Sequence, residues 1–416
     1  MAKNTFSIVS LGCFRNTYDS EVVAKKLSLE GYAIKQDAVS CGVLAINTCG
    51  FIDKAKQESV HAIRDAVKLK KQGKIKRLIV FGCLVQRYKK ELQDAFPEVD
   101  QWQGVQGFTK KASKRIKLFP SHVEFVKISE GCRNNCSYCA IPIIKGSLKS
   151  RPQQEIINEI RTLNGKGVKE LNLIGQDITS WGKDLSAKAG LTDLLKKIIK
   201  TADMPWIRLL YTHPKHLQDS LIELIASEKR ICKYIDLPIQ HINDRLLKLM
   251  NRRTARAQIK RLISKIRRKI PNCFLRTSVI VGFPGETEAE FKELLEFIKD
   301  VRFERLGAFA YSREEGTAAY SFSDQVHYRR KNRRYNEIMR CQQNIADSVN
   351  SQFLGKEIDV LIEEKEKDVF VGRTQYDAYE VDGEVFIKMK DLKIGTFHKT
   401  RITDVYGYDL IGGPTE

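Results

Sequence analysis

The residues in this sequence best suited to chemistry are three cysteines in the run Cys132-Arg-Asn-Asn-Cys136-Ser-Tyr-Cys139. Three thiolates at C-x3-C-x2-C spacing on one loop can bind three irons of a 4Fe–4S cluster and leave the fourth iron without a protein ligand. Such an iron can chelate S-adenosylmethionine, and one electron then cleaves its C–S bond to give a 5′-deoxyadenosyl radical. The alternative is a zinc site, but zinc prefers four closed ligands and this run supplies only three.

Three further cysteines, Cys13, Cys49 and Cys83, each follow a short strand-like run. These runs are Phe6–Leu11, Val43–Ile46 and Leu78–Phe81. A single cysteine at a strand end is most often a small buried hydrophobic residue. In an open parallel sheet, however, the carboxyl ends of the strands share the edge where ligands bind. Three cysteines at equivalent positions therefore predict a shared metal or cluster site.

The elements around these cysteines alternate, which is typical of parallel β-α units. In the segment 1–115 the strand-like runs are followed by helical patterns near 18–30, 53–70 and 86–95. This segment is predicted to be an open parallel-sheet domain.

The segment 120–350 repeats the alternation six times and ends in a basic helical stretch at 328–350. Its expected strands are Glu124–Ile128, Glu170–Ile174, Ile207–Tyr211, Tyr234–Leu237, Leu275–Val281 and Leu306–Tyr311. Six successive units predict an open, partial barrel with its chemistry at the strand carboxyl ends. Polar residues lie at those ends: Cys132, Gln176, Asp177, His213, Gln240, His241, Glu286 and Ser312. We expect His213 and His241 to be structural.

The last segment, 355–416, has the alternating pattern of short strands, with turn signals at Asp382-Gly383 and Gly412-Gly413. About 60 residues of this kind fit a small five-stranded barrel. The fold class expected for the chain is therefore α/β, with an N-terminal parallel sheet, a partial (βα)6 barrel and a C-terminal antiparallel β-barrel.

Composition limits the class of protein. The 416 residues are 42% hydrophobic and 30% charged, as in globular proteins. No apolar run approaches the roughly 20 residues that span a bilayer, and the start MAKNTFSIVS lacks the pattern of a secretion signal. We expect a cytoplasmic protein with no membrane association, in which the ten cysteines are reduced. Cys41, Cys232, Cys273 and Cys341 match no motif and are expected to be structural.

Charge is divided unevenly along the chain. The whole carries +21, but residues 356–416 hold 9 Lys/Arg against 14 Asp/Glu, a net of −5. A basic body joined to an acidic tail suggests a role in binding partners.

Together these motifs give the whole chain a resemblance to the radical SAM methylthiotransferases. Within that group it most resembles the RimO family, which methylthiolates an aspartate of small-subunit ribosomal protein number twelve. The resemblance is carried by SLGCFRNTYDSE (10–21), NTCGFIDKAKQES (47–59), FGCLVQRY (81–88), EGCRNNCSYCAIPIIKGSLKSRP (130–152), LIGQD (173–177), DLPIQH (236–241), TSVIVGFPGET (277–287) and GRTQYDAYEVDG (372–383). It implies a C-terminal TRAM domain.

The resemblance also favours one branch of these enzymes. The run Gly50–Asp53 and the stretch Asp377 to Gly383 favour the ribosomal-protein branch over the tRNA-modifying, MiaB-like branch. Phe14-Arg15 replaces the family's common Pro-Lys, outside the expected ligand positions. An acidic terminal barrel also suits a basic protein substrate better than tRNA.

Residue roles follow from the resemblance. Cys132, Cys136 and Cys139 are expected to be catalytic, holding the radical-generating cluster, while Cys13, Cys49 and Cys83 would hold an auxiliary 4Fe–4S cluster. Gly282, Gly285 and Glu286 match the stretch near the adenosyl cofactor, and Gln176 is a weaker candidate. Two equivalents of S-adenosylmethionine are expected, one to methylate sulfur and one to remove a hydrogen from the β-carbon of the aspartate.

The implied partners are a small-subunit ribosomal protein, ribosomal RNA nearby, and a reduced electron donor of the flavodoxin or ferredoxin type. Two alternatives stay open at this point. One is the same chemistry on an adenosine of tRNA, and the other is a non-catalytic iron–sulfur protein that binds RNA or the ribosome.

Overall fold

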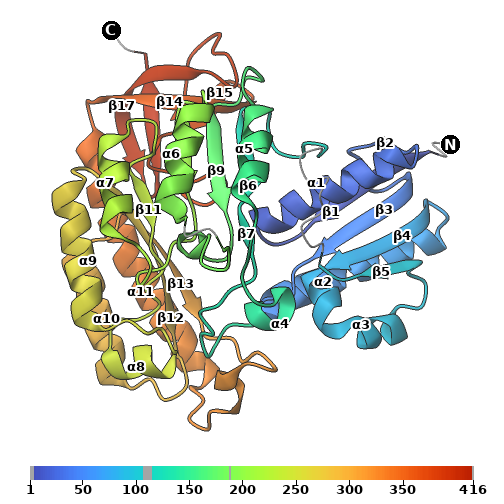
Figure 1. The fold of residues 1–416 in the computed structure, drawn as a ribbon, viewed down its shortest axis with the longest axis horizontal. Helices are drawn as coiled ribbons and strands as arrows, with labels where there is room; N and C mark the ends of the chain where they lie inside the picture. Colours follow the sequence, from blue (N-terminus) through green and yellow to red (C-terminus); the bar gives the residue numbers. More distant parts are fainter. Residues whose placement is uncertain (1–3, 106–114, 187–188, 415–416) are drawn as a thin grey trace.

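The computed structural model describes residues 4–105, 115–186 and 189–414, and its architecture is α/β with a separate β-barrel at the C-terminal end (Figure 1). The expected domain limits at 1 and 416, and the last residues before 115, lie outside the described residues. In the part that is described, no helix is long and apolar enough to cross a membrane.

The first sheet is entirely parallel, with the strand order β2-β1-β3-β4-β5. Its strands are β1 (Thr5–Ser10), β2 (Ala33–Ile34), β3 (Cys41–Thr48), β4 (Ile75–Gly82) and β5 (Gln101–Gln103). Its helices are α1 (Phe14–Leu29), α2 (Asp53–Lys71) and α3 (Cys83–Ala95). Apolar residues of α1 cover one face, and those of α2 and α3 cover the other. Cover on both faces explains why all eight residues of β3 are buried.

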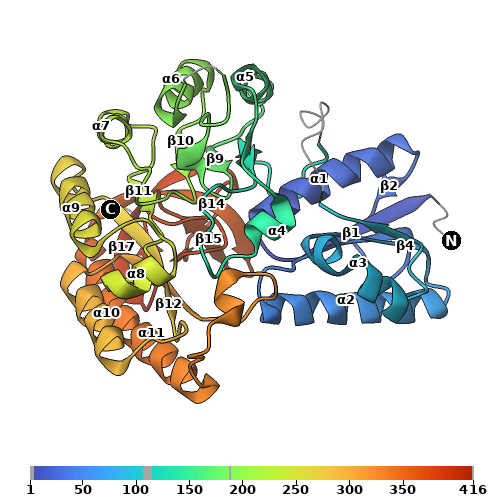
Figure 2. The ribbon, with the colours of Figure 1, turned by 60° about the horizontal axis from the view of Figure 1, so that its bottom comes forward.

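The second region is an open barrel of six parallel strands in chain order, in two sheets of three. Its strands are β6 (Val123–Lys127), β9 (Glu170–Ile174), β10 (Trp206–Leu209), β11 (Tyr234–Asp236), β12 (Phe274–Val281) and β13 (Arg305–Ala310). Five helices lie outside them: α5 (Gln153–Arg161), α6 (Leu191–Thr201), α7 (Asp219–Ser227), α9 (Arg256–Lys269) and α10 (Glu288–Val301). Figure 2 shows this outer layer. The two sheets meet between β10 and β11, where Ile207 bridges to Ile231 just before β11 and Thr212 N donates to Asp236 O at 3.1 Å.

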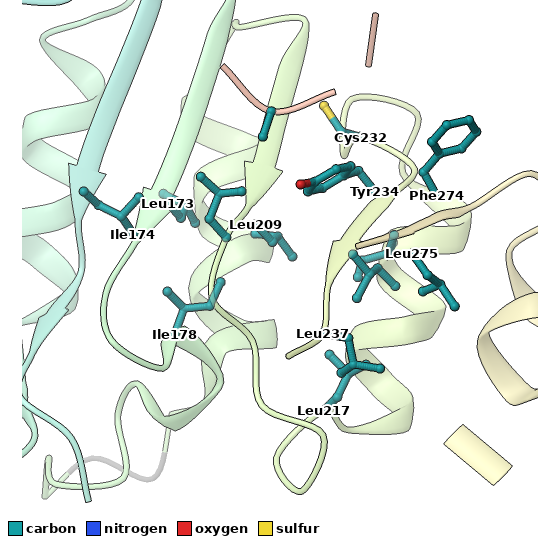
Figure 3. Packing of buried hydrophobic residues seen from close by; sticks show 14 of the residues in the cluster. Leu173, Ile174, Ile178, Leu209, Leu217, Cys232, Tyr234, Leu237, Phe274 and Leu275 are labelled. Carbon is teal, nitrogen blue, oxygen red and sulfur yellow. The ribbon is translucent and has the colours of Figure 1, made fainter. Parts of the chain in front are cut away.

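One hydrophobic cluster runs through this barrel and its helices, with Leu173, Leu209 and Leu275 among its buried side chains (Figure 3). The prediction of six strands is confirmed, because each strand is a short apolar run whose pattern is local. The region also contains the short antiparallel pair β7 (Ser129–Glu130) and β8 (Lys149–Ser150) and the short helices α4 (Ile141–Lys145) and α8 (Asp244–Leu249).

The C-terminal barrel packs against the amino ends of the barrel strands. It follows α11 (Tyr328–Asn350) and closes in the order β14-β15-β16-β18-β17. Its strands are β14 (Glu357–Glu366), β15 (Val369–Arg373), β16 (Val385–Ile387), β17 (Phe397–Tyr406) and β18 (Asp409–Gly413). In Figure 1 the arrow of β9 points away from β14 and β15. The opposite, carboxyl ends of the strands are thus left free for the site.

Buried ion pairs make this contact. Glu170 binds both Arg208 and Arg373, each at 2.5 Å, and Arg305 binds Asp377 at 2.6 Å. Asp382 lies 3.4 Å from Arg276 and accepts a hydrogen bond from the Tyr234 hydroxyl at 2.7 Å. Part of the acidity of the tail therefore faces inward and neutralises arginines of the barrel.

One turn prediction is wrong. Gly412 and Gly413 lie inside β18, paired with Ile387 and Arg401, and the chain turns earlier, at Gly407. A Cβ atom on Gly412 would overlap Cγ2 of the buried Thr400. The glycine therefore reflects close packing across the small barrel, which strand patterns also allow.

Gly412→Ala is expected to lower the free energy of unfolding by about 1–3 kcal/mol, because the methyl group overpacks a stiff, buried neighbour. Gly413→Ala is the matched control, since its Cβ would meet Thr403 at an ordinary 3.5 Å, and its effect should stay within about 0.5 kcal/mol. Urea unfolding of both variants measures this. Equal effects at the two positions would show that Gly412 is not required by packing.

Candidate functional site

Cys13, Cys49 and Cys83 meet at one edge of the first sheet. The strands before them, β1, β3 and β4, are neighbours whose last residues are in register, Ser10 with Asn47 and Thr48 with Gly82. A Cβ on Gly12 would lie 2.8 Å from Cys49 Cβ, and one on Gly50 would lie 2.9 Å from the carbonyl carbon of Cys83. The three cysteine loops thus pack so closely that Gly12 and Gly50 leave no room for a Cβ atom.

Asn16 holds these loops together. Its Nδ2 donates to the carbonyls of Leu11 at 2.8 Å and Thr48 at 3.3 Å, and its Oδ1 lies 3.6 Å from Cys83 Sγ. Its own carbonyl accepts from Asn47 Nδ2 at 2.6 Å. These bonds require α1 to begin at Phe14, immediately after Cys13, rather than near residue 18 as the sequence pattern indicated.

Cys132, Cys136 and Cys139 lie on the loop between β7 and α4, at the carboxyl edge of the barrel. The loop starts at Gly131, whose φ of +74° suits glycine, and Cys139 N donates to Cys136 O at 3.1 Å. The C-terminal end of α8 supports it: Ser137 Oγ donates to Leu249 O at 2.7 Å, and Ser137 N donates to Met250 O at 3.1 Å.

Each triad has a nearby guanidinium group. Arg15 Nε lies 3.4 Å from Cys13 Sγ, and Arg252 Nη1 lies 3.6 Å from Cys136 Sγ. Burial raises the pKa of Cys13, but the charge and hydrogen bond of Arg15, with nearby backbone N–H groups, outweigh it and leave the pKa below its usual value. At Cys83 burial dominates, and the neighbouring cysteine thiolates add to it, so the pKa rises to about 12. Burial and Cys136 likewise raise the pKa of Cys139 to about 12.

The two triads face each other across the contact between the first sheet and the barrel. Cys83 packs against Ala140 and Ile144, the residues that follow the second triad. From the other side, Arg15 Nη1 donates to the carbonyl of Gly175, at the carboxyl end of β9, at 3.0 Å. The residues next to one triad therefore contact the residues next to the other.

Buried charges fix this contact. Lys127 and Lys145 lie between Asp19 and Glu130, with Lys145 3.1 Å from Asp19 and 2.8 Å from Glu130. Lys127 pairs with the same two carboxylates. The lysine charges outweigh burial and hold the pKa of Asp19 below its usual value. Arg87 of α3 makes a second link, 2.8 Å from the buried Glu314.

The four residues expected near the cofactor do not share one environment. Gln176 follows β9, and its buried Oε1 has no hydrogen-bond partner within the described structure. Glu286 is buried and fully engaged, bonding Gly282 N and pairing with Arg334 at 2.7 Å and His241 at 3.3 Å. Gly282 and Gly285 have φ of +69° and +77°. Glu286 thus supports the glycine loop from behind, whereas Gln176 has an open acceptor.

Several of the other polar residues at the strand ends form hydrogen bonds with other groups of the protein. Asp177 accepts from Asn134 Nδ2 and His216 Nδ1, both at 2.8 Å. Burial lowers the pKa of His213 to about 2, so the ring is neutral at physiological pH. Gln240, like Tyr211 after β10, has a positive φ, of +70°. Ser312 accepts a bond from Asp53 N at 3.2 Å, in the contact with the first sheet.

Sequence reasoning missed Arg15, Asn134 and Arg252. Arg15 stands where the sequence departs from the family pattern, outside any ligand position, yet its guanidinium contacts Cys13. Asn134 Nδ2 lies 3.4 Å from Cys132 Sγ. The position of Asn134 inside the cysteine run could have indicated its role. No local pattern could have indicated Arg252, because it lies 116 residues from the cysteine that it contacts.

The donor sets suit iron–sulfur clusters better than a single metal ion. Within the described residues, no three His, Cys, Asp or Glu side chains are grouped as they would be around one ion. A four-iron cluster instead takes each thiolate on a different iron, so its ligands surround a larger volume. The buried Nε of Arg252, beside the second triad, and the buried Oε1 of Gln176, after β9, have no hydrogen-bond partner among the described residues. A polar ligand at the carboxyl edge of the barrel could supply such partners.

Comparison with known proteins assigns the three regions. Residues 126–298 match the Radical SAM superfamily, residues 5–104 the Uncharacterized protein family UPF0004, and residues 354–414 the TRAM domain. The chain is 43% identical to the ribosomal protein uS12 methylthiotransferase RimO of Phocaeicola vulgatus, over 99% of both chains. It is 42% identical to RimO of Clostridioides difficile, over 98% of both. In fold it resembles the radical S-adenosylmethionine methyltransferase TsrM of Kitasatospora setae, with a TM-score of 0.53, 13% identity, and coverage of 74% of this chain and 75% of that one.

Lys145→Met is expected to lower the free energy of unfolding by about 3–5 kcal/mol, because it leaves two buried carboxylates with one lysine. The control is Lys299→Met, which removes an exposed pair with Glu296 and should leave stability nearly unchanged, because solvent screens such a pair. Denaturant unfolding of the purified variants checks both values. A loss at Lys145 no greater than that at Lys299 would mean that the buried cluster does not hold the two regions together.

Proposed function

The chain belongs to the RimO family of radical SAM methylthiotransferases, and from this premise we propose that it methylthiolates the β-carbon of an aspartate in ribosomal protein uS12. The enzyme uses S-adenosylmethionine and two 4Fe–4S clusters. The observation that supports the proposed reaction best is the pairing of two cysteine triads, with Cys83 of one packed on Ala140 beside the other.

We propose that Cys132, Cys136 and Cys139 hold the cluster that binds S-adenosylmethionine, and that Cys13, Cys49 and Cys83 hold the auxiliary cluster. When bound, the first cluster supplies the electron that cleaves S-adenosylmethionine, and the second carries the sulfur that is transferred. Three protein ligands in each triad support this assignment, since they leave one iron of each cluster free for a non-protein partner.

The surrounding residues position these groups and exclude water. Asn134 connects Cys132 to the buried Asp177, which limits the movement of the loop. Gln176, with its open Oε1, is proposed to contact the cofactor. Gly282 and Gly285 are proposed to let it approach the backbone, with Glu286 bracing their loop through Arg334. Apolar packing of Cys83 on Ile144 shields this side of the first triad from water, which favours radical chemistry.

We also propose that the acidic C-terminal barrel contacts the basic substrate. Besides the acids that bind the arginines of the larger barrel, Glu364 and Glu366 are exposed on β14. Burial raises the pKa of nearby Glu384, and Asp409 and Glu364 raise it further. This face lies at the end of the barrel opposite the cysteines, so it would hold a part of uS12 remote from the target aspartate.

The remaining parts of the proposal concern organisation and context. We propose domains at 1–115, 120–350 and 355–416, supported by the separate sheets and the limits of the family matches. Cytoplasmic localisation, ribosomal RNA against the basic body, and a flavodoxin- or ferredoxin-type electron donor are proposed as well. The names of the relatives favour uS12 over tRNA as substrate.

Two cysteine variants test the assignment. Cys136→Ser should abolish both 5′-deoxyadenosine formation and modification of uS12, because the first cluster is lost. Cys49→Ser should still form 5′-deoxyadenosine but transfer no methylthio group. In both, bound iron should fall from roughly eight to roughly four ions per chain. The assay incubates reconstituted enzyme with reductant, S-adenosylmethionine and uS12, and measures nucleoside, iron and protein mass.

The control is Cys232→Ser, because Cys232 is buried and belongs to neither triad. This variant should bind as much iron as the wild type. The proposal fails if wild-type enzyme modifies tRNA but not uS12, or if Cys49→Ser still transfers the methylthio group.

A further inference from the structure

Arg15 lies beside the first cysteine triad and also contacts the barrel. Its Nε donates to Cys13 Sγ at 3.4 Å, and its Nη1 donates to Gly175 O at 3.0 Å. The guanidinium carbon lies 4.4 Å from the centre of the Tyr211 ring, at the carboxyl end of β10. A single side chain of the first sheet thus reaches the mouth of the barrel.

This arginine has no carboxylate partner within the described residues. Many other buried or half-buried arginines of the chain pair with an Asp or Glu, as Arg87, Arg151 and Arg334 do at 2.6–2.8 Å. Arg252 also lacks a carboxylate, but it is only 5% exposed and enclosed beside Cys136. Arg15 is half-buried, and its Nη2 makes no hydrogen bond to any described residue.

An arginine in this state provides an anion site. A guanidinium group has five N–H donors, and the contacts of Arg15 use two of them. A cation that is partly removed from water without a counter-ion is costly, and a carboxylate bound to two N–H groups offsets that cost. The open donors therefore suit a planar carboxylate.

Tyr211, the residue against which the Arg15 guanidinium packs, is itself held in a fixed position. Tyr211 has a φ of +66°, which is strained for an aromatic residue. Its N–H donates to Asp236 Oδ2 at 2.9 Å, and Asp236 in turn pairs with Arg276 at 3.1 Å. Strained backbone kept by such a network marks functional positions. The ring covers one face of the guanidinium, so an incoming anion meets its N–H edge.

We propose that Arg15 binds the side-chain carboxylate of the target aspartate and thereby selects aspartate at that position. The inference rests on the proposed function, because it takes uS12 as the substrate. The carboxylate is bonded directly to the β-carbon that reacts, so holding it fixes that carbon where the first triad meets the carboxyl ends of β9 and β10. Asparagine has nearly the same shape but turns an amide N–H toward the cation, and is rejected for that reason.

The test is a binding cycle with two enzymes and two substrates. Holoenzyme with Arg15 or with Arg15→Gln is titrated, with S-adenosylmethionine and without reductant, against uS12 carrying aspartate or asparagine at the target position. We expect the wild type to bind the asparagine form about tenfold more weakly, and Arg15→Gln to bind both forms equally weakly. Arg15→Lys, which keeps the charge, should retain part of the preference. Iron content identical to the wild type shows that the clusters are intact.

Arg133→Met is the control, since Arg133 is an exposed cation on the nearby cysteine loop, and it should change the affinity for both forms by the same factor. If Arg15→Gln weakens both forms alike and the tenfold preference persists, Arg15 acts through the cluster or the fold and the proposal is wrong. Loss of the preference in Arg15→Lys to the level of Arg15→Gln would also contradict a charge-based role. Failure of the proposed function gives a different result, because wild-type holoenzyme would then neither bind nor modify uS12.

Discussion

The buried contact between Asp19, Lys127, Glu130 and Lys145 determines how the rest of the structure can work. Asp19 lies on the helix that follows Cys13, whereas Lys145 ends the helix that follows Cys139. The cluster therefore connects the two triads through their own neighbouring helices. A buried ion-pair network adds little net stability compared with apolar packing, but an incorrect arrangement leaves charges unpaired at high cost. It thus specifies one docking geometry, and the stacking of Phe14 on Phe125 at 4.6 Å contributes the apolar part.

The same logic explains the uneven charge of the chain. Arginines in the amino-terminal parts of the barrel strands are neutralised by acids of the C-terminal barrel, as Arg305 is by Asp377. Some of the acidity that suggested a basic partner is therefore structural, and only the exposed acids, such as Glu364 and Glu366, remain for a substrate. Closing the amino end in this way leaves the carboxyl end, with its cysteines, as the open face of the barrel.

Much of the fold and of the site was predictable from sequence because its signals are local. The six barrel strands and the helix at 328–350 follow from short-range patterns, and the convergence of Cys13, Cys49 and Cys83 follows from the geometry of parallel sheets. Strands β2 and β5 are two and three residues long and carry no such pattern. The roles of Arg15 and Lys145 were missed because their partners, Gly175 and Asp19, are 160 and 126 residues away in the sequence. The turn at Gly412 was predicted wrongly because a glycine is equally typical of a turn and of close packing.

The central claim is that this docked pair of triads modifies an aspartate of uS12. The most direct measurement is the intact mass of uS12, together with the modified nucleosides of tRNA, from cells that contain or lack the gene. Our account predicts that uS12 loses about 46 Da in its absence, one methylthio group in place of hydrogen, while tRNA stays unchanged. An unchanged uS12 mass with loss of a methylthiolated adenosine would contradict it.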